Sequence, residues 1–327
     1  STATAKAARL LRGRHRLALS GTPIENHIGE LWSLFEFLNP GMLGSSRVFE
    51  RSISADGEIR EGARELVSRA VRPFVLRRTK SQVAKDLPEK LEETIFCELL
   101  PEQRILYDEL RTHYRDALLT EPDEQGFKQN KIQVLEALLR LRQVACHPGL
   151  VDPERRGEHS AKIDAFVDTV DEVVDSGRKV LAFSQFTSLL SIVRDRLDEL
   201  NITYEYLDGK TRNREEKVDR FQNDDDCKVF LISLKAGGYG LNLTAAEYVF
   251  LLDPWWNPAV ESQAIDRAHR IGQKRNVFAY RFIAKDTVEE KVLELQKSKK
   301  ALADAIIGAD NSLIRSLERK DLELLLS

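Results

Sequence analysis

Cysteine is scarce in this sequence, and its placement argues against two classes of small domain. There are three cysteines, Cys97, Cys146 and Cys227, and no CxxC pair occurs among them. This usage argues against a disulfide scaffold and against a cysteine zinc site, and it fits a reducing cytosol. Cys146 and His147 are adjacent rather than spaced as metal ligands, so we expect a buried cysteine and a capping histidine. We therefore predict no metal site built from the residues of this chain.

Long apolar runs and a dominant charge are also missing. No apolar run approaches the ~20 residues that a membrane-spanning helix needs, so no membrane partner is expected. Charged residues make up 31% of the chain, but they nearly cancel to a net charge of −3. The overall balance therefore gives no argument for nucleic acid, and a basic site must be a local patch. Two stretches contain several basic residues and no acidic ones, residues 71–85 and residues 267–275.

A third absence concerns nucleotide binding. The chain has no GxxxxGK[ST] phosphate loop, and its run Gly237-Gly238-Tyr239-Gly240 does not match GxGxxG. A nucleotide hydrolase needs a phosphate cradle and an acid that holds magnesium. Because the chain begins at Ser1 without a methionine, we expect a fragment of a longer protein, with that cradle located upstream.

The second half of the chain alternates short apolar runs with helical patterns. The runs at 180–183, 204–207, 229–232, 248–252 and 277–283 predict strands. Together with the helical segments between them, they predict a parallel sheet covered on both faces, which is an α/β fold. The first half is richer in helical patterns, with strands predicted at 16–19, 73–80 and 93–99.

Ligands of an open parallel sheet bind outside the carboxyl ends of its strands. In this chain the segments that follow predicted strands are rich in hydroxyls, amides and glycines; they are residues 184–187, 208–211, 233–242 and 253–258. Such a composition suits contacts to phosphate through backbone amides and hydroxyl groups. It includes neither a Cys/His/Asp cluster nor a nucleophile with an adjacent base.

One segment carries a pattern of arginines that suits an anion. Asn257 is suited to begin a helix and Gly272 to end it, and on that helix Gln263, Arg267 and Arg270 would share one face. Guanidinium groups are planar, permanently charged forks that match phosphate oxygens. An ordinary surface helix with a solvated basic face would show the same spacing. Since the chain lacks a phosphate cradle, the simplest account is that these arginines supply charge across a cleft to a phosphoryl group.

The chain resembles the SWI/SNF-type ATPases, the double-stranded DNA translocases of helicase superfamily two. The stretches that carry the resemblance cover nearly the whole chain: LSGTPIEN at 19–26, LWSL at 31–34, the basic turn at 74–80, residues 141–148, SQF at 184–186, residues 233–242, DPWWNP at 253–258 and QAIDRAHRIGQ at 263–273. The first stretch resembles the third motif of the family. The next two resemble its first helical insertion and the return from it, and residues 141–148 resemble the second insertion. The last four resemble the fourth motif, the fifth motif, the block that follows the fifth, and the sixth motif. The terminal Gly-Gln of the last stretch is typical of this family rather than of RNA helicases.

The resemblance implies two RecA-like lobes with ATP and Mg²⁺ in the cleft between them, held mainly by the first lobe. It implies that Arg267 and Arg270 are arginine fingers. It implies that Gln263 and Asp266 lie near the nucleotide, and that Gly238 and Gly240 approach the nucleotide or the coupling loop. Near the DNA it implies Ser184, Gln185, Lys210, Ser233, Lys235 and Trp256. It also implies that the third-motif residues Ser20, Gly21 and Thr22 couple the nucleotide site to the DNA site.

The resemblance also divides the chain into parts. We expect the tail of the first RecA-like lobe at 1–25, a helical protrusion and return at 26–90, a linker and second protrusion at 91–158, the second RecA-like lobe at 159–285, and a C-terminal helical brace at 286–327. The expected fold is thus a RecA-like parallel sheet flanked by helices, with an α-helical insertion region.

The function implied is the C-terminal half of an ATP-dependent double-stranded DNA translocase or remodeller. Its partners would be duplex DNA, ATP and its own first lobe, in the bacterial cytoplasm and nucleoid or in a nucleus. The fragment alone should be inactive, because it lacks the phosphate loop. Two alternatives stay open: an RNA-directed superfamily-two helicase and a non-catalytic nucleic-acid-binding module.

Overall fold

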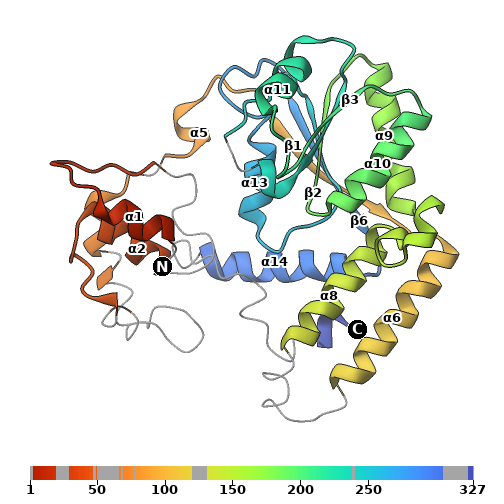
Figure 1. Ribbon diagram of the computed structural model, residues 1–327, viewed down its shortest axis with the longest axis horizontal. Coiled ribbons are helices and arrows are strands. Elements are labelled where there is room, and N and C mark those ends of the chain that lie inside the picture. Colours follow the sequence, from red (N-terminus) through yellow and green to blue (C-terminus); the bar gives the residue numbers. More distant parts are fainter. Residues whose placement is uncertain are drawn as a thin grey trace. The chain divides into compact units, whose positions relative to one another are not determined.

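The computed structural model shows two compact units in the chain (Figure 1). It describes residues 3–19, 29–46, 49, 66–67, 69–76, 78–119, 131–237, 240–304 and 323–326. One unit comprises Ser1–Val83 and Gln296–Leu317, and the other comprises Ala84–Leu295 and Glu318–Ser327. Each unit is described by itself below.

The smaller unit is helical in its described part. Its elements are α1 (Ala3–Leu10), α2 (Gly29–Leu38), the 3₁₀ helix η1 (Arg72–Phe74) and α5 (Lys80–Val83). Leu31 and Phe35 of α2 are buried, as the apolar spacing predicts. The strands predicted at 16–19 and 73–80 are wrong: the described residues there form no strand, and Leu17 and Leu19 are exposed. A strand needs a neighbour to satisfy its backbone groups, and the described part of this unit offers none.

The larger unit is built on one sheet of six strands. These are β1 (Lys90–Cys97), β2 (Val180–Ser184), β3 (Tyr204–Leu207), β4 (Val229–Ser233), β5 (Tyr248–Leu251) and β6 (Val277–Ala284). Their order across the sheet is β1-β6-β5-β2-β4-β3, and every neighbouring pair is parallel. The parallel α/β sheet predicted from the sequence is therefore confirmed.

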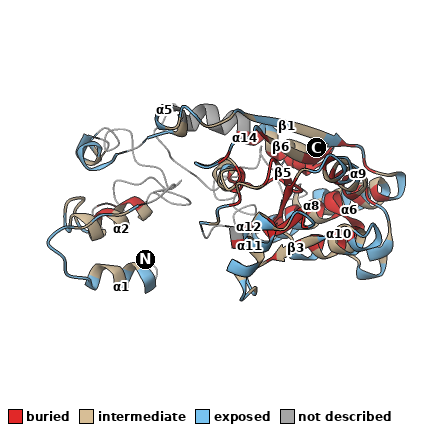
Figure 2. Cartoon of the chain, turned by 90° about the horizontal axis from the view of Figure 1, so that it is seen from above, coloured by how far each residue is buried: buried red, intermediate tan, exposed pale blue. Residues whose placement is uncertain are grey.

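Helices cover both faces of the sheet (Figure 1). They include α9 (Ala161–Asp175) and α10 (Thr187–Glu199) on one face, and α11 (Arg214–Asn223) and α13 (Pro258–Ile265) on the other. Successive strand residues alternate between the two cores: Val180 and Ala182 pack with α9 and α10, whereas Leu181 and Phe183 pack with α11 and α13. Because both faces are covered, the central strands are apolar at nearly every position, and Figure 2 shows them as buried.

Residues before the predicted lobe also join this unit. β1 pairs with β6 at the edge of the sheet, although all of it except Lys90 lies in the range 91–158 that we expected to be a linker and second protrusion. The long helices α6 (Pro101–Leu119) and α8 (Lys131–Cys146) follow it. The sheet therefore draws on residues outside 159–285, and the other domain boundaries remain predictions.

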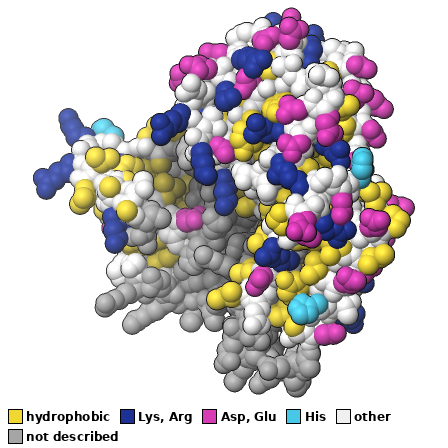
Figure 3. Space-filling view, turned by 45° about the vertical axis from the view of Figure 1, so that its right-hand side comes forward, with side chains coloured by type: hydrophobic (Ala, Val, Ile, Leu, Met, Phe, Trp, Pro, Cys, Tyr) yellow, Lys and Arg dark blue, Asp and Glu magenta, His cyan; other side chains and the backbone are white. Residues whose placement is uncertain are grey.

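The chain after the sheet begins with α14 (Val288–Asp304), whose residues up to Leu295 belong to the larger unit. His147 caps the short helix η2 (Pro148–Leu150), because its Nδ1 accepts a hydrogen bond from the amide of Gly149 at 2.9 Å. The capping histidine expected from the sequence is thus confirmed. Within the described ranges, no helix has the length and apolar character needed to cross a bilayer. Positive and negative side chains are interspersed over the face of the larger unit seen in Figure 3.

Candidate nucleotide and nucleic-acid interface

Several of the predicted site residues lie at the carboxyl edge of the parallel sheet, whereas the turn of Arg267 and Arg270 contacts residues that precede β5 and β1. Ser184 ends β2 and Ser233 ends β4, and these two residues are paired in register. Asp253 follows β5, whose neighbour is β2. In a parallel sheet these ends share one edge, so the segments that the sequence places after separate strands become neighbours.

Helix α13 begins at this edge, at Pro258, as the sequence predicts. Asn257 is its N-cap, with the side-chain Oδ1 accepting from the amide of Ala259 at 2.8 Å, and Pro258 lies in the first turn. Glu261 anchors the helix, since its carboxylate accepts from the amide of Trp255 at 2.8 Å and from Arg281 at 2.8 Å. Burial raises the pKa of Glu261, and Arg281 opposes that rise.

The arginines do not lie on this helix, contrary to the expectation of one helix ending at Gly272. α13 ends at Ile265, and residues 266–272 form turns and bends. The amide of Arg267 bonds to the carbonyl of Ala264 at 3.1 Å, and that of Arg270 to the carbonyl of Ala268 at 3.0 Å. Those are separations of three and two residues, rather than the four of an α-helix. The spacing argument that put Gln263, Arg267 and Arg270 on one helical face is therefore wrong.

Hydrogen bonds from Gln273 and Leu243 hold the turns at residues 266–272. The side-chain amide of Gln273 donates to the carbonyls of Ala246 at 2.9 Å, Thr244 at 3.1 Å and Ala268 at 3.3 Å. The amide of Leu243 donates to the carbonyl of Arg267 at 3.0 Å. The carbonyls of Arg267 and Ala268 are thus satisfied by tertiary partners, which holds this turn without a helical continuation.

Arg267 is half-buried and incompletely paired. Its Nε is buried and has no hydrogen-bond partner among the described residues. Burial lowers the pKa of Arg267, and the nearby charge of Arg270 lowers it further, while Asp266 raises it. A desolvated guanidinium with an unused donor beside a second guanidinium is an arrangement that an anion would stabilise.

Arg270 connects this turn to the glycine-rich loop. It is exposed, and its Nη1 donates to the carbonyl of Gly240 at 3.3 Å. Gly240 has φ +69°, the left-handed region where glycine is favoured. Gly238 lies outside the described residues, and so do Ser20, Gly21 and Thr22. Gln263 and Asp266 are half-buried next to the turn.

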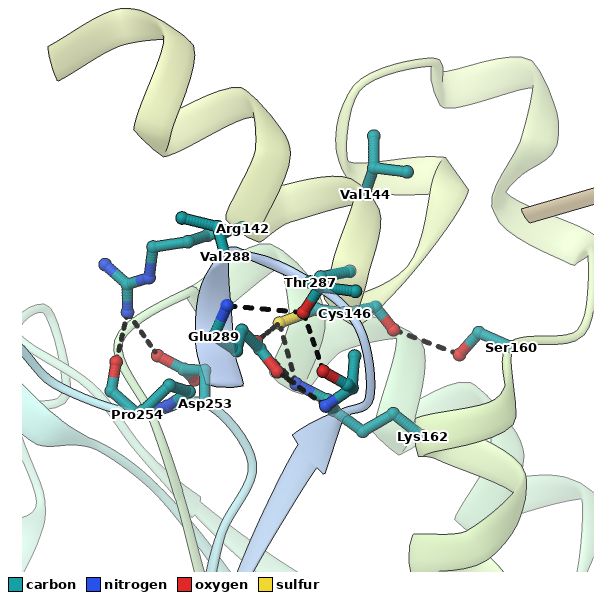
Figure 4. A network of polar contacts seen from close by, with 12 residues as sticks. Arg142, Val144, Cys146, Ser160, Lys162, Asp253, Pro254, Thr287, Val288 and Glu289 are labelled. Carbon is teal, nitrogen blue, oxygen red and sulfur yellow. Dashed lines mark hydrogen bonds and ion pairs between the residues drawn. The ribbon is translucent and has the colours of Figure 1, made fainter. Parts of the chain in front are cut away.

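A buried arginine organises the fourth motif. Arg142 of α8 is 3% exposed, and its guanidinium donates to the carbonyl of Pro254 and forms an ion pair with Asp253 at 3.7 Å (Figure 4). It also donates to Oε1 of Gln185 at 3.4 Å. Ser184 is fully buried, and its hydroxyl donates to Asp253. Burial raises the pKa of Asp253, and Arg142 and Ser184 act against that rise. Ser184 thus positions Asp253, whereas we expected a hydroxyl near the DNA backbone.

The other residues expected near DNA occupy different environments. Lys210 and Lys235 are exposed after β3 and β4, while Ser233 is 4% exposed. Trp256 is 8% exposed and lies under the guanidinium of Arg142, with 5.5 Å from the Arg142 carbon to the ring centre. The Nε2 of Gln185 is buried without a hydrogen-bond partner in the described structure. The lysines and Gln185 therefore retain groups for a ligand, and Trp256 packs as a structural residue.

Sequence reasoning did not identify the structural roles of Arg142, Glu261 or Gln273. Each is a buried polar side chain that hydrogen-bonds a backbone group outside its own element. Arg142 and Gln273 lie in stretches that carry the family resemblance, but no local pattern indicates these backbone partners. Among the described residues, no group of three or more His, Cys, Asp or Glu side chains is placed to hold a metal ion.

Comparison with known proteins agrees with this architecture. Residues 1–150 match the model of the SNF2-related domain, and residues 161–272 match that of the helicase conserved C-terminal domain. The chain is 38% identical to the putative ATP-dependent helicase/translocase YwqA of Bacillus subtilis, covering 98% of this chain and 36% of YwqA. It is 35% identical to human TATA-binding protein-associated factor 172, covering 97% of this chain and 20% of that protein. The chain thus spans about a third or less of these relatives.

A solved structure extends the likeness to the fold. The Sulfolobus solfataricus SWI2/SNF2 ATPase core in complex with dsDNA is 34% identical, with a TM-score of 0.62, and the match covers 99% of this chain and 69% of that one. Two family models, the relatives' sequences and this structural match all agree. The chain therefore belongs to the SWI/SNF-type (SNF2) family of ATPases in helicase superfamily two.

Proposed function

We propose that this chain supplies the second RecA-like lobe of an ATP-driven double-stranded DNA translocase. The observation that carries the proposal is the half-buried Arg267, whose Nε has no partner among the described residues, beside Arg270 in the turn that follows α13. The partly desolvated pair fits a phosphate group better than a solvated basic face. Family membership, and relatives named as ATP-dependent helicases, support ATP as the source of that phosphate.

In this proposal the nucleotide is held by two lobes. Arg267 and Arg270 would face its phosphates from this chain, with Gln263 and Asp266 beside them and the loop of Gly238 and Gly240 approaching the nucleotide or the coupling loop. ATP with Mg²⁺ supplies the phosphoryl group and neutralises part of its charge. The arginines stabilise the charge that develops on that group and need no proton transfer. The phosphate loop would belong to the first lobe, whose third-motif residues Ser20, Gly21 and Thr22 would couple the cleft to DNA.

The proposed DNA contacts are non-specific. Lys210 and Lys235 present donors after the carboxyl ends of β3 and β4, and Gln185, whose Nε2 is buried without a partner among the described residues, and Ser233 lie at the same edge of the sheet. Ser184 and Trp256 act behind this surface, through Asp253 and Arg142. Contacts to the phosphate backbone carry no sequence code, which suits a motor that moves along DNA. The related Sulfolobus ATPase core forms a complex with dsDNA, which supports duplex DNA as the track.

The choice of nucleic acid can be tested by stimulation of ATP hydrolysis. For a protein that joins this chain to a first RecA-like lobe, we expect duplex DNA to raise the steady-state rate at least ~10-fold, and single-stranded RNA to leave it near the basal level. The expected stimulation should weaken as salt is raised from 50 to 200 mM, because backbone contacts release counterions. Equal or greater stimulation by RNA would favour the RNA-directed helicase instead. A lack of response to either would favour a non-catalytic binding module.

A further inference from the structure

One edge of the sheet is open. β3 ends the strand order and pairs with β4 alone among the described strands. Figure 2 shows β3 between α10 and α11. One row of β3 backbone amides and carbonyls therefore has no strand partner in the described structure, which makes this edge available to another extended chain.

A groove of about 830 Å³ runs along this edge. It is lined from both neighbouring helices and by the strand itself, and its main side chains are Arg194, Tyr204, Tyr206, Arg212, Lys217 and Arg220. We call it the β3 groove. The four residues of β3 span ~13 Å, which is enough to pair with a short extended segment.

The β3 groove carries more positive than negative charge. Arg194, Arg212, Lys217 and Arg220 line it, against Asp198 and Glu205. Lys217 and Arg220 share the carboxylate of Glu205, at 2.6 and 2.8 Å, and Arg220 also pairs with Asp224 at 3.3 Å. Arg212 is exposed and forms no ion pair with the described residues, so the groove can accept a carboxylate from a ligand there.

The opposite wall of the groove is aromatic and rigid. The guanidinium of Arg194 lies over the ring of Tyr206 at 5.0 Å, and its Nε donates to the hydroxyl of Tyr204 at 3.3 Å. That hydroxyl in turn donates to Asp198 at 3.2 Å. The tyrosines are thus held in place, and they offer flat surfaces to the side chains of a bound segment.

We propose that the β3 groove binds an acidic peptide segment of a partner protein, which adds to the sheet as an extended strand beside β3. Backbone hydrogen bonds to β3 would supply affinity, and alternate side chains would lie toward the tyrosine wall and toward Lys217 and Arg220. A peptide fits better than a nucleic acid, because the free edge presents donors and acceptors in alternation. A phosphodiester backbone offers acceptors only.

The test is selection from a displayed library of random twelve-residue peptides on the immobilised chain. We expect the selected peptides to be enriched in Asp and Glu. Binding of a fluorescent copy, measured by anisotropy, should weaken at least ~10-fold on Arg212→Glu and on Lys217→Gln. Arg115→Glu is the matched control, since Arg115 is an exposed arginine of α6 away from the groove, and it should leave binding unchanged. N-methylation of alternate peptide amides should abolish binding in one of the two registers.

Three results would overturn the proposal. The first is selection that yields no peptides, or peptides without acidic residues. The second is peptide binding that survives Arg212→Glu, Lys217→Gln or N-methylation in both registers. The third is binding of a decathymidylate oligonucleotide that Arg212→Glu abolishes while no peptide binds, which would make the groove a nucleic-acid surface. Circular dichroism melts of the two groove variants establish that each is folded before binding is compared.

Discussion

Replacing Arg267 by alanine, in a protein that joins this chain to a first RecA-like lobe, should lower the rate of ATP hydrolysis at least ~10³-fold. The turn after α13 holds this guanidinium half-buried, with an Nε that has no partner among the described residues. Charge stabilisation that acts mainly in the transition state changes the rate more than the affinity. ATP affinity, measured with a fluorescent analogue, should therefore change only a few-fold. Arg270→Ala should act in the same direction.

Two control variants test whether the lost rate comes from the guanidinium of Arg267 or from the removal of any positive charge in this stretch. Lys274→Ala removes an exposed cation from the same basic stretch and should leave hydrolysis nearly unchanged. Arg267→Lys keeps the charge but loses the planar fork, so it should restore little of the rate. Hydrolysis within threefold of the parent protein after Arg267→Ala would contradict the assignment. A loss of ATP affinity equal to the loss of rate would make Arg267 a ground-state binding residue.

Removing one partner of the buried Lys162–Glu289 ion pair should destabilise the larger unit by about 3–5 kcal/mol. Lys162 Nζ of α9 lies 2.6 Å from Glu289 Oε1 of α14, and both side chains are fully buried. Cys146, the last residue of α8, lies beside them (Figure 4). Burial lowers the pKa of Lys162, but the carboxylate of Glu289 outweighs it, so the net shift is upward. Lys162→Met leaves an unpaired buried carboxylate, which is the source of the cost. Urea unfolding at 25 °C measures it.

The double variant Lys162→Met/Glu289→Leu distinguishes this explanation from a simple packing defect. With both charges gone, most of the lost stability should return, because no buried charge is left unpaired. The exposed pair Lys285–Glu98, at 2.9 Å, is the matched control, and Lys285→Met should change stability little. If the double variant is no more stable than Lys162→Met, the pair is not what holds α9 and the start of α14 together.

The sheet could be predicted from the sequence because its signal is local. Each central strand is a short apolar run that two helical layers bury, so pattern and burial coincide at Val180–Ser184 and Val229–Ser233. The order of the strands could not be predicted in this way. Placing β1 beside β6 depends on packing between segments almost 190 residues apart, which no local pattern encodes.

The arginine segment shows where local patterns fail. Its spacing suits a helix through Gly272, and the cap at Asn257 forms as predicted. The helix nevertheless ends at Ile265, and in the turn that follows Gln273 and Leu243 donate hydrogen bonds to the carbonyls of Ala268 and Arg267. Likewise Glu289 lies in a Thr-x-x-Glu capping segment, but its partner Lys162 is 127 residues away. The sequence therefore predicts the cap at Asn257 but not the turn that presents Arg267 and Arg270.

The central claim is that the ATPase site is composite, and ATP hydrolysis by this chain alone tests it most directly. Steady-state phosphate release would be measured with saturating ATP, Mg²⁺ and duplex DNA, for this chain and for a protein that joins it to a first RecA-like lobe. We expect no DNA-stimulated turnover from this chain, and Arg267-dependent turnover from the joined protein. Clear turnover by this chain alone would contradict the account, because it would place a complete phosphate site within these 327 residues.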